Sequence, residues 1–134
     1  MMAKGAMMSD FSISLPDRPG ELARLASMLR EAEVNLVGLW GYGAGQGKAR
    51  FYCVPETAEQ FRNFAHSAGL EVEEGKTFYL TGDGRPGSLT EWLDKIASAG
   101  INLHAIQAVQ MHGEFGCFIW ADSEDWDALA RLLT

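Results

Sequence analysis

The chain has 134 residues, 47% of them hydrophobic, which is enough for one ordinary domain or two small domains with a packed core. Its formal net charge of −7 argues against a nucleic-acid partner, because phosphate binding depends on clustered Lys and Arg side chains. No apolar run approaches the roughly 20 residues that cross a bilayer, and the first residues do not resemble a signal peptide. We therefore expect a cytoplasmic protein with no membrane partner, in which Cys53 and Cys117 are buried free thiols.

The first part of the chain predicts a strand, a turn and a helix. Residues 1–9 have no clear periodicity and are expected to form a loose, flexible tail. Apolar and polar residues alternate over 11–15, which predicts a strand with one buried face, and Asp17-Arg18-Pro19-Gly20 predicts a turn. Apolar residues then recur at i, i+3, i+4 and i+7, so the helix that follows is expected to bury Leu22, Leu25, Ala26 and Leu29.

A hairpin and a second helix complete the first predicted unit. Apolar, β-branched and aromatic runs at 34–42 and 47–54 flank a glycine-rich segment, which predicts a hairpin with a flexible tip. Thr57-x-x-Gln60 resembles a capping box that opens a helix, and residues 70–73 alternate as a short strand. Residues 10–74 therefore predict an α+β, ferredoxin-like βαββαβ unit, with two helices on one face of an antiparallel sheet.

The second predicted unit spans residues 75–134 and follows the same order of elements. A strand at 77–80 precedes a helix, a hairpin at 101–110 and 114–121, and a last helix. No run remains for a fourth strand, so the sheet of this unit is expected to have an open edge. We expect the other unit or a second chain to cover that edge, and we expect a homodimer.

The two units are related by an internal repeat. Arg18-Pro19-Gly20 returns 67 residues later as Arg85-Pro86-Gly87, and Asn35-Leu36 returns at the same spacing as Asn102-Leu103. Repeated polar residues suggest repeated sites.

Elementary chemistry indicates what such a site would bind. A helix start with Pro19 and Gly20 lets a guest approach the backbone, and its N–H groups favour a carboxylate. Asn35 offers a donor and an acceptor, and Asp17 would suit an ammonium group. The alternative is that these residues only shape and cap turns, with Arg18 and Arg85 as solvated ion-pair partners.

At this point the sequence resembles a known family. The strand, the Asp-Arg-Pro-Gly turn, the helix and the Val34-Asn35-Leu36 strand entry resemble the ACT domain, and the resemblance covers about residues 10–134 as two tandem copies. The second copy departs from the pattern, because Gly84 stands where the first copy has Asp17, with Asp83 one position earlier. The resemblance implies a ligand-binding set of Asp17, Arg18, Pro19, Gly20, Asn35, Leu36, Arg85, Pro86, Gly87, Asn102 and Leu103.

The resemblance implies a non-catalytic regulatory protein that binds an amino acid between its units and signals through assembly or an enzyme or regulator in trans. An assembly module that binds no small molecule is one alternative. A small acylphosphatase-like hydrolase is another, with Arg18 and Asn35 in the catalytic roles, although the phosphate cradle of such an enzyme is missing. No His and Cys residues have metal-ligand spacing, so we expect neither a metal nor a cofactor.

Overall fold

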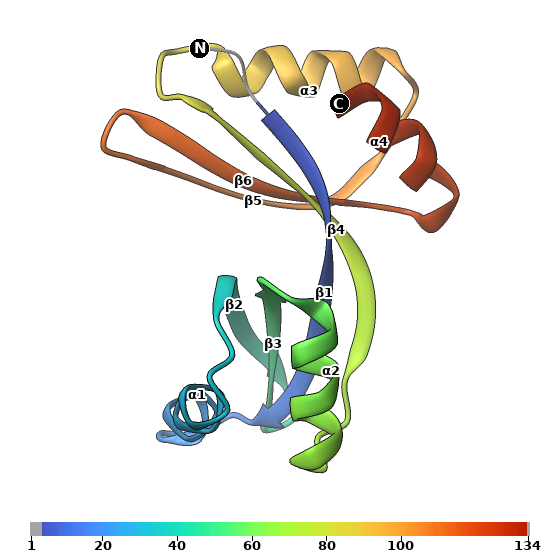
Figure 1. The fold of residues 1–134 in the computed structure, drawn as a ribbon. Coiled ribbons are helices and arrows are strands. Elements are labelled where there is room, and N and C mark those ends of the chain that lie inside the picture. The colour runs from blue at the N-terminus through green and yellow to red at the C-terminus, as the bar shows by residue number, and fades with distance from the viewer. Residues whose placement is uncertain (1–3, 134) are drawn as a thin grey trace. The chain divides into compact units, whose positions relative to one another are not determined.

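The computed structural model describes residues 4–133, which form six strands, four α-helices and a short 3-10 helix (Figure 1). In chain order the elements are β1 (Lys4–Pro16), α1 (Glu21–Glu31), β2 (Leu36–Gly45), β3 (Lys48–Pro55), α2 (Ala58–Ser67), β4 (Glu73–Asp83), α3 (Ser88–Ser98), β5 (Leu103–Met111), β6 (Glu114–Ala121), η1 (Ser123–Asp125) and α4 (Trp126–Leu133). The hydrogen-bonded strand order is β2-β3-β1-β4-β6-β5. The protein is therefore α+β, and both predicted hairpins are confirmed.

The chain divides into two compact units, and each of them contains part of β1 and part of β4. The N unit consists of residues 9–75, and the C unit consists of residues 76–133 together with the described part of the N-terminal segment, 4–8. The prediction of a loose tail was wrong for residues 4–8, because β1 begins at Lys4. Residues 1–3 of that tail lie outside the described residues.

The edge that the sequence left open in the C unit is paired in the structure. β4 lies between β1 and β6 in the strand order, and residues 4–8 supply the β1 part within this unit. Gly5 is packed closely there, since a Cβ atom at this position would lie 3.0 Å from Leu80 Cδ2 and 2.8 Å from Leu133 Cβ. The prediction that this unit lacks a fourth strand was therefore wrong, because its partner strand comes from the opposite end of the chain.

The short strand predicted at 70–73 was wrong for its first three residues, because the strand begins at Glu73 as part of β4. Residues 70–72 lie outside any strand, and β4 runs without a break from Glu73 to Asp83. Gly75 in this strand allows a close approach, since a Cβ atom there would lie 2.8 Å from Oδ1 of the buried Asp10.

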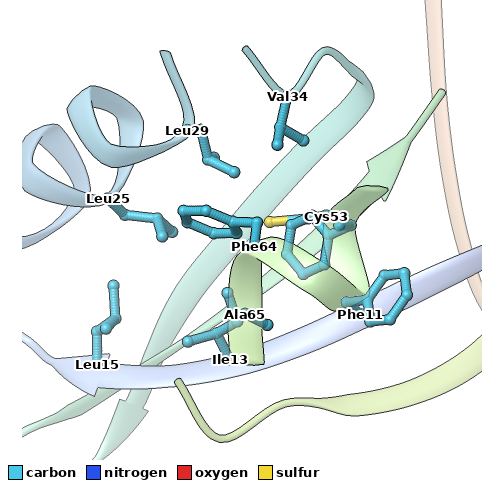
Figure 2. Close-up of a cluster of buried hydrophobic side chains, with 10 residues drawn as sticks. Phe11, Ile13, Leu15, Leu25, Leu29, Val34, Cys53, Phe64 and Ala65 are labelled. Carbon is cyan, nitrogen blue, oxygen red and sulfur yellow. The ribbon is translucent and has the colours of Figure 1, made fainter. Parts of the chain in front are cut away.

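The core of the N unit lies between the sheet and its two helices. β1 and β3 pair in the register Phe11↔Cys53 and Ile13↔Phe51, so their apolar side chains point to the same side. Figure 2 shows side chains from β1, α1, β3 and α2 converging there. The buried cluster comprises Phe11, Ile13, Leu15, Leu25, Leu29, Val34, Cys53, Phe61, Phe64 and Ala65.

Two local predictions for the helices of this unit need correction. Leu22 and Ala26 are exposed, so α1 buries a face offset from the predicted one, with Leu25 and Leu29 at its centre. Thr57 is the N-cap of α2 but makes no side-chain capping hydrogen bond. Gln60, the second member of the predicted capping box, instead donates to the carbonyl oxygen of Glu33 at 3.1 Å.

The C unit has a separate core built in the same way. Its buried cluster comprises Phe78, Leu80, Ile96, Ile101, Phe115, Cys117, Ile119, Ala121, Leu129 and Leu133. Cys117 here and Cys53 in the N unit are both free and buried, as predicted. Burial raises the pKa of the Cys53 thiol to about 12 and that of Cys117 to about 11, which leaves both protonated and unreactive at neutral pH.

The close packing of Gly5 predicts that the C unit depends on residues 4–8. We expect Gly5→Val to destabilise the protein by about 1–3 kcal/mol, the usual cost of overpacking, because its side chain would meet Leu80 and Leu133. Urea unfolding measures the stability, and hydrogen exchange of the β4 amides locates the effect. Ala6→Val, at the exposed neighbouring position, is the matched control, and equal stabilities of the two variants would contradict the prediction.

Candidate functional site

The two Arg-Pro-Gly turns have the same backbone structure. Gly20 and Gly87, the N-caps of α1 and α3, both lie in the left-handed region, with φ of 92° and ψ of −16° and −13°. Each carbonyl oxygen accepts a hydrogen bond of 2.9 Å from the helix, donated by the amide of Arg24 or of Glu91. Glycine is favoured at both positions because a Cβ atom is strained at this φ. The repeat seen in the sequence is therefore a repeat of conformation.

The arginines of both turns are held in ion pairs. Arg18 lies 3.6 Å from the buried carboxylate of Glu21, and Arg85 lies 3.0 Å from Asp83. Ser88 occupies the position of Glu21 in the second copy, is equally buried, and donates a hydrogen bond of 2.6 Å to Asp83. The carboxylate that pairs with the arginine thus comes from the helix in one copy and from the preceding strand in the other.

Asp83 is kept ionised by its surroundings. The hydrogen bond from the Ser88 hydroxyl makes the largest contribution to holding the pKa of the Asp83 carboxyl well below its usual range, and the backbone N–H and the guanidinium of Arg85 also lower this pKa. The C-unit turn therefore presents an anchored negative charge at neutral pH.

The space between turn and hairpin is filled from opposite sides in the two copies. In the N unit, Oδ2 of Asp17 lies 2.8 Å from where a Cβ atom of Gly43 would stand. In the C unit, the carboxamide of Gln110 lies 2.9 Å from the corresponding point on Gly84. Gly84 and Gln110 follow Asp17 and Gly43 by 67 residues each. The turn thus supplies a carboxylate in one unit, and the hairpin supplies a carboxamide in the other.

The C-unit turn borders a hollow of about 490 Å³. The hollow is formed by the β4–α3 turn, the first turn of α3, the end of β5 and one residue of β6. Its lining residues are Asp83, Gly84, Arg85, Pro86, Gly87, Ser88, Leu89, Thr90, Ala108, Val109, Gln110 and Phe115. Three predicted ligand-binding residues, Arg85, Pro86 and Gly87, thus lie beside Gln110. Gln110 was not among the predicted residues, although the 67-residue spacing of the repeat pairs it with Gly43.

Asn35 and Leu36 lie at the far end of the N-unit sheet from the turn. Leu36 pairs with Pro55, whereas Pro16, just before the turn, pairs with Lys48. These two β3 residues are seven positions apart, or about 24 Å at the usual rise of a strand. Because α1 reverses the direction of the chain, the strand that follows the helix begins opposite the turn. The turn and Asn35 therefore do not form one site within this unit.

The C unit repeats this separation. Leu103 pairs with Ala121, whereas Asp83, just before the second turn, pairs with Glu114, again seven positions along the same strand. Asn102 and Leu103 accordingly do not line the hollow beside the turn.

A larger hollow of about 860 Å³ lies in the N unit along β1 and residues 69–74. Its two arginines already have carboxylate partners, Arg50 with Glu73 at 3.2 Å and Arg62 with Glu74 at 2.7 Å. None of the predicted ligand-binding residues lines it. We therefore take the smaller hollow beside the C-unit turn as the candidate site.

Within residues 4–133, no group of three or more His, Cys, Asp and Glu side chains is placed to hold a metal ion. None of the helices in the same range is long and apolar enough to cross a membrane.

No protein-family model and no curated protein matches the chain. Several solved structures do. A Bacteroides thetaiotaomicron protein matches with a TM-score of 0.83 at 14% identity, over 96% of this chain and 88% of its own. The regulatory subunits of aspartate kinase from Thermus thermophilus and Thermus flavus match with TM-scores of 0.69 and 0.61, at 16% and 17% identity, over 99% of this chain and 95% of theirs. The protein has the ACT-domain fold. It shares this fold with the two regulatory subunits of aspartate kinase.

The anchored charge of Asp83 predicts a pH-dependent stability. Its folded-state pKa is lowered, so the stabilisation by the ionised carboxylate is present above the ordinary Asp pKa of about 4 and is lost as the pH falls through the acid range. We expect Asp83→Asn to lower the melting temperature at pH 7, with the difference from the wild type shrinking below about pH 4. Thermal unfolding between pH 2 and pH 8 measures it. Asp94→Asn, on the exposed side of α3, is the control, and a difference independent of pH would refute the assignment.

Proposed function

We propose that this ACT-type chain is a regulatory protein without catalytic activity that binds an amino acid beside the β4–α3 turn. The observation that carries the proposal is the hollow of about 490 Å³, in which the Arg85-Pro86-Gly87 turn meets the end of β5. This volume falls within the range of about 300–1,000 Å³ that is typical of small-molecule sites. The regulatory role of the aspartate kinase subunits with the same fold supports the proposal.

The lining of the hollow suits both charged groups of an amino acid. The first N–H groups of a helix have no partner within the helix, and those at the start of α3 favour the ligand carboxylate. The Asp83 carboxylate favours the ammonium group. Leu89, Val109 and Phe115 supply apolar surface for the ligand side chain.

We propose that Asn35 and Asn102 contact the ligand only after assembly with another unit or chain. Each lies about 24 Å along the sheet from the turn of its own unit, so a ligand that touches a turn meets such an asparagine only if another unit or chain supplies it. We propose that the complete ligand site forms in this way, at an interface. Binding would then favour one assembly, and an enzyme or regulator acting in trans would read that assembly.

The edge strands support a homodimer, which is also the basis of the assembly-module alternative. β2 and β5 are the outermost strands in the sheet order, and both expose large apolar side chains. Leu39 and Ile106 are 41% and 47% exposed, and they occupy equivalent positions 67 residues apart. Exposed apolar edge strands are typical of pairing surfaces. We propose that a second copy pairs along one of these edges, in a cytoplasmic homodimer.

The hydrolase alternative requires Arg18 and Asn35 to act together on one substrate. Arg18 is engaged by Glu21, and Asn35 lies at the opposite end of the N-unit sheet, so the two do not meet in one unit. We propose no enzyme activity.

Thermal stability tests the ligand. We expect at least one of the twenty L-amino acids, added at millimolar concentration, to raise the melting temperature, because a ligand that prefers the folded state stabilises it. Inorganic phosphate and acetyl phosphate serve as controls for the hydrolase. A response to phosphates alone would revive that alternative, and no response to any compound would leave the assembly module.

Charges on the edge strands test the homodimer. We expect Leu39→Lys or Ile106→Lys to weaken dimerisation about tenfold or more, because each places a charge on a proposed contact. Sedimentation equilibrium measures the monomer–dimer constant. Ala97→Lys, at an exposed position of α3, carries the same charge change away from both edges. If both edge variants dimerise like this control, the proposed contact is wrong.

A further inference from the structure

We infer that the two turns are different sites despite their identical backbone, and that Gln110 makes the C-unit turn accept an amino acid with an uncharged side chain, whereas Asp17 closes the N-unit turn to carboxylates. This inference rests on the proposed function, because it assigns the specificity of the same hollow. It also implies one bound amino acid per chain rather than the two that a perfect repeat would hold.

The two turns have the same backbone structure, so any difference in what they bind must come from their side chains. Both turns place a left-handed glycine before the helix, and both are fastened to the tip of the neighbouring hairpin. Asp17 N donates to Gly47 O at 2.9 Å, and Gly84 N donates to Gly113 O at 2.7 Å. The N–H groups that would receive a carboxylate are therefore offered in the same geometry twice.

The side chain next to those N–H groups has opposite consequences in the two units. The carboxylate of Asp17 lies over Gly43, whereas the carboxylate of Glu21 at the same turn is paired with Arg18 at 3.6 Å and Arg24 at 3.2 Å. A ligand carboxylate that approached over Gly43 would meet the Asp17 carboxylate and be repelled by it. Gln110 fills the equivalent space with a neutral carboxamide that both donates and accepts, and within residues 4–133 this carboxamide makes no hydrogen bond of its own.

The hairpins differ at the same point. In the N unit, the pairing of β2 with β3 shifts register between Gly43 and Gly45, which leaves Ala44 as the extra residue of a β-bulge. In the C unit, β5 pairs with β6 without a shift from Ala105 to Met111. The part of β5 that carries Gln110 is thus regular up to the hairpin turn, and the Gln110 carboxamide is directed at Gly84.

The other residues that line the hollow beside the C-unit turn favour one class of amino acid. Leu89, Val109 and Phe115 form an apolar wall, and Asp83 provides a fixed negative charge. An acidic ligand side chain would face that charge, whereas an uncharged side chain would meet the apolar wall. The geometry therefore favours neutral amino acids over aspartate and glutamate.

Calorimetric titration of the wild type and of two single variants tests the inference. The probes are L-valine, L-leucine, L-methionine, L-threonine, L-glutamine, L-aspartate and L-glutamate, each titrated separately. We expect one equivalent of a neutral probe per chain, and a loss of affinity of about tenfold or more in Gln110→Glu. Gln107→Glu is the matched control, since it introduces the same charge on the same strand but on the opposite face.

A transplant into the N unit provides the converse test. Within residues 4–133, Asp17 is the only neighbour that a Cβ atom on Gly43 would meet within 4 Å, so Asp17→Gly combined with Gly43→Gln removes that contact and copies the C-unit residues. We expect the folded double variant to bind a second equivalent of the same probe per chain. Circular dichroism and an unchanged melting temperature establish that it is folded.

The outcomes separate the two proposals. If only amino acids with charged side chains bind or raise the melting temperature, the specificity inference is wrong and the proposed function stands. Two equal sites in the wild type, or equal affinities of Gln110→Glu and Gln107→Glu, would also overturn only the inference, as would a folded double variant that still binds one equivalent. If no L-amino acid binds or stabilises the wild type, the proposed function itself fails.

Discussion

Backbone groups along a strand must find hydrogen-bonding partners, and in both units of this protein that need is met by β1 and β4. The C unit obtains its outer strand from residues 4–8, which precede it by almost seventy positions in the sequence. Gly5 and Gly75 follow from this arrangement. Each lies where a neighbouring side chain, Leu133 or Asp10, occupies the space that a Cβ atom would need. The stability of the C unit is thus tied to a segment with little hydrophobic pattern of its own.

The second constraint is the pair of left-handed glycines that begin α1 and α3. They fix the same turn twice and offer helix N–H groups in the same way, so the main chain alone would make two equal sites. The side chains differ. Asp17 and Glu21 give the first turn two carboxylates, whereas Gly84 and Ser88 at the same positions leave the second turn with Asp83 and with Gln110 from the hairpin. A duplicated scaffold can hold two unlike sites, because function depends on the side chains that a fold presents.

The proposed function gives these differences a regulatory role. The separation of each turn from the asparagine of its own unit means that ligand binding and assembly are coupled if both groups contact the ligand. The exposed apolar side chains of β2 and β5 provide the surfaces through which such an assembly would form. In this proposal the hollow beside the second turn sets the ligand, and the edge strands transmit its presence.

Sequence periodicity determined most of the local structure. The alternation at 11–15, the burial of Leu25 and Leu29, the two hairpins and the repeated turn are properties of neighbouring residues, and they appear in the structure as predicted, whereas Leu22 and Ala26 of the predicted apolar stripe are exposed. The tertiary structure alone decided which distant segments meet: residues 4–8 with β4, Gln110 with Gly84, and Asn35 with the far end of the sheet rather than with its turn. The physical reason is that periodicity reports which face of an element is buried, whereas the pairing of strands and the close approach of a side chain to a glycine depend on the path of the whole chain.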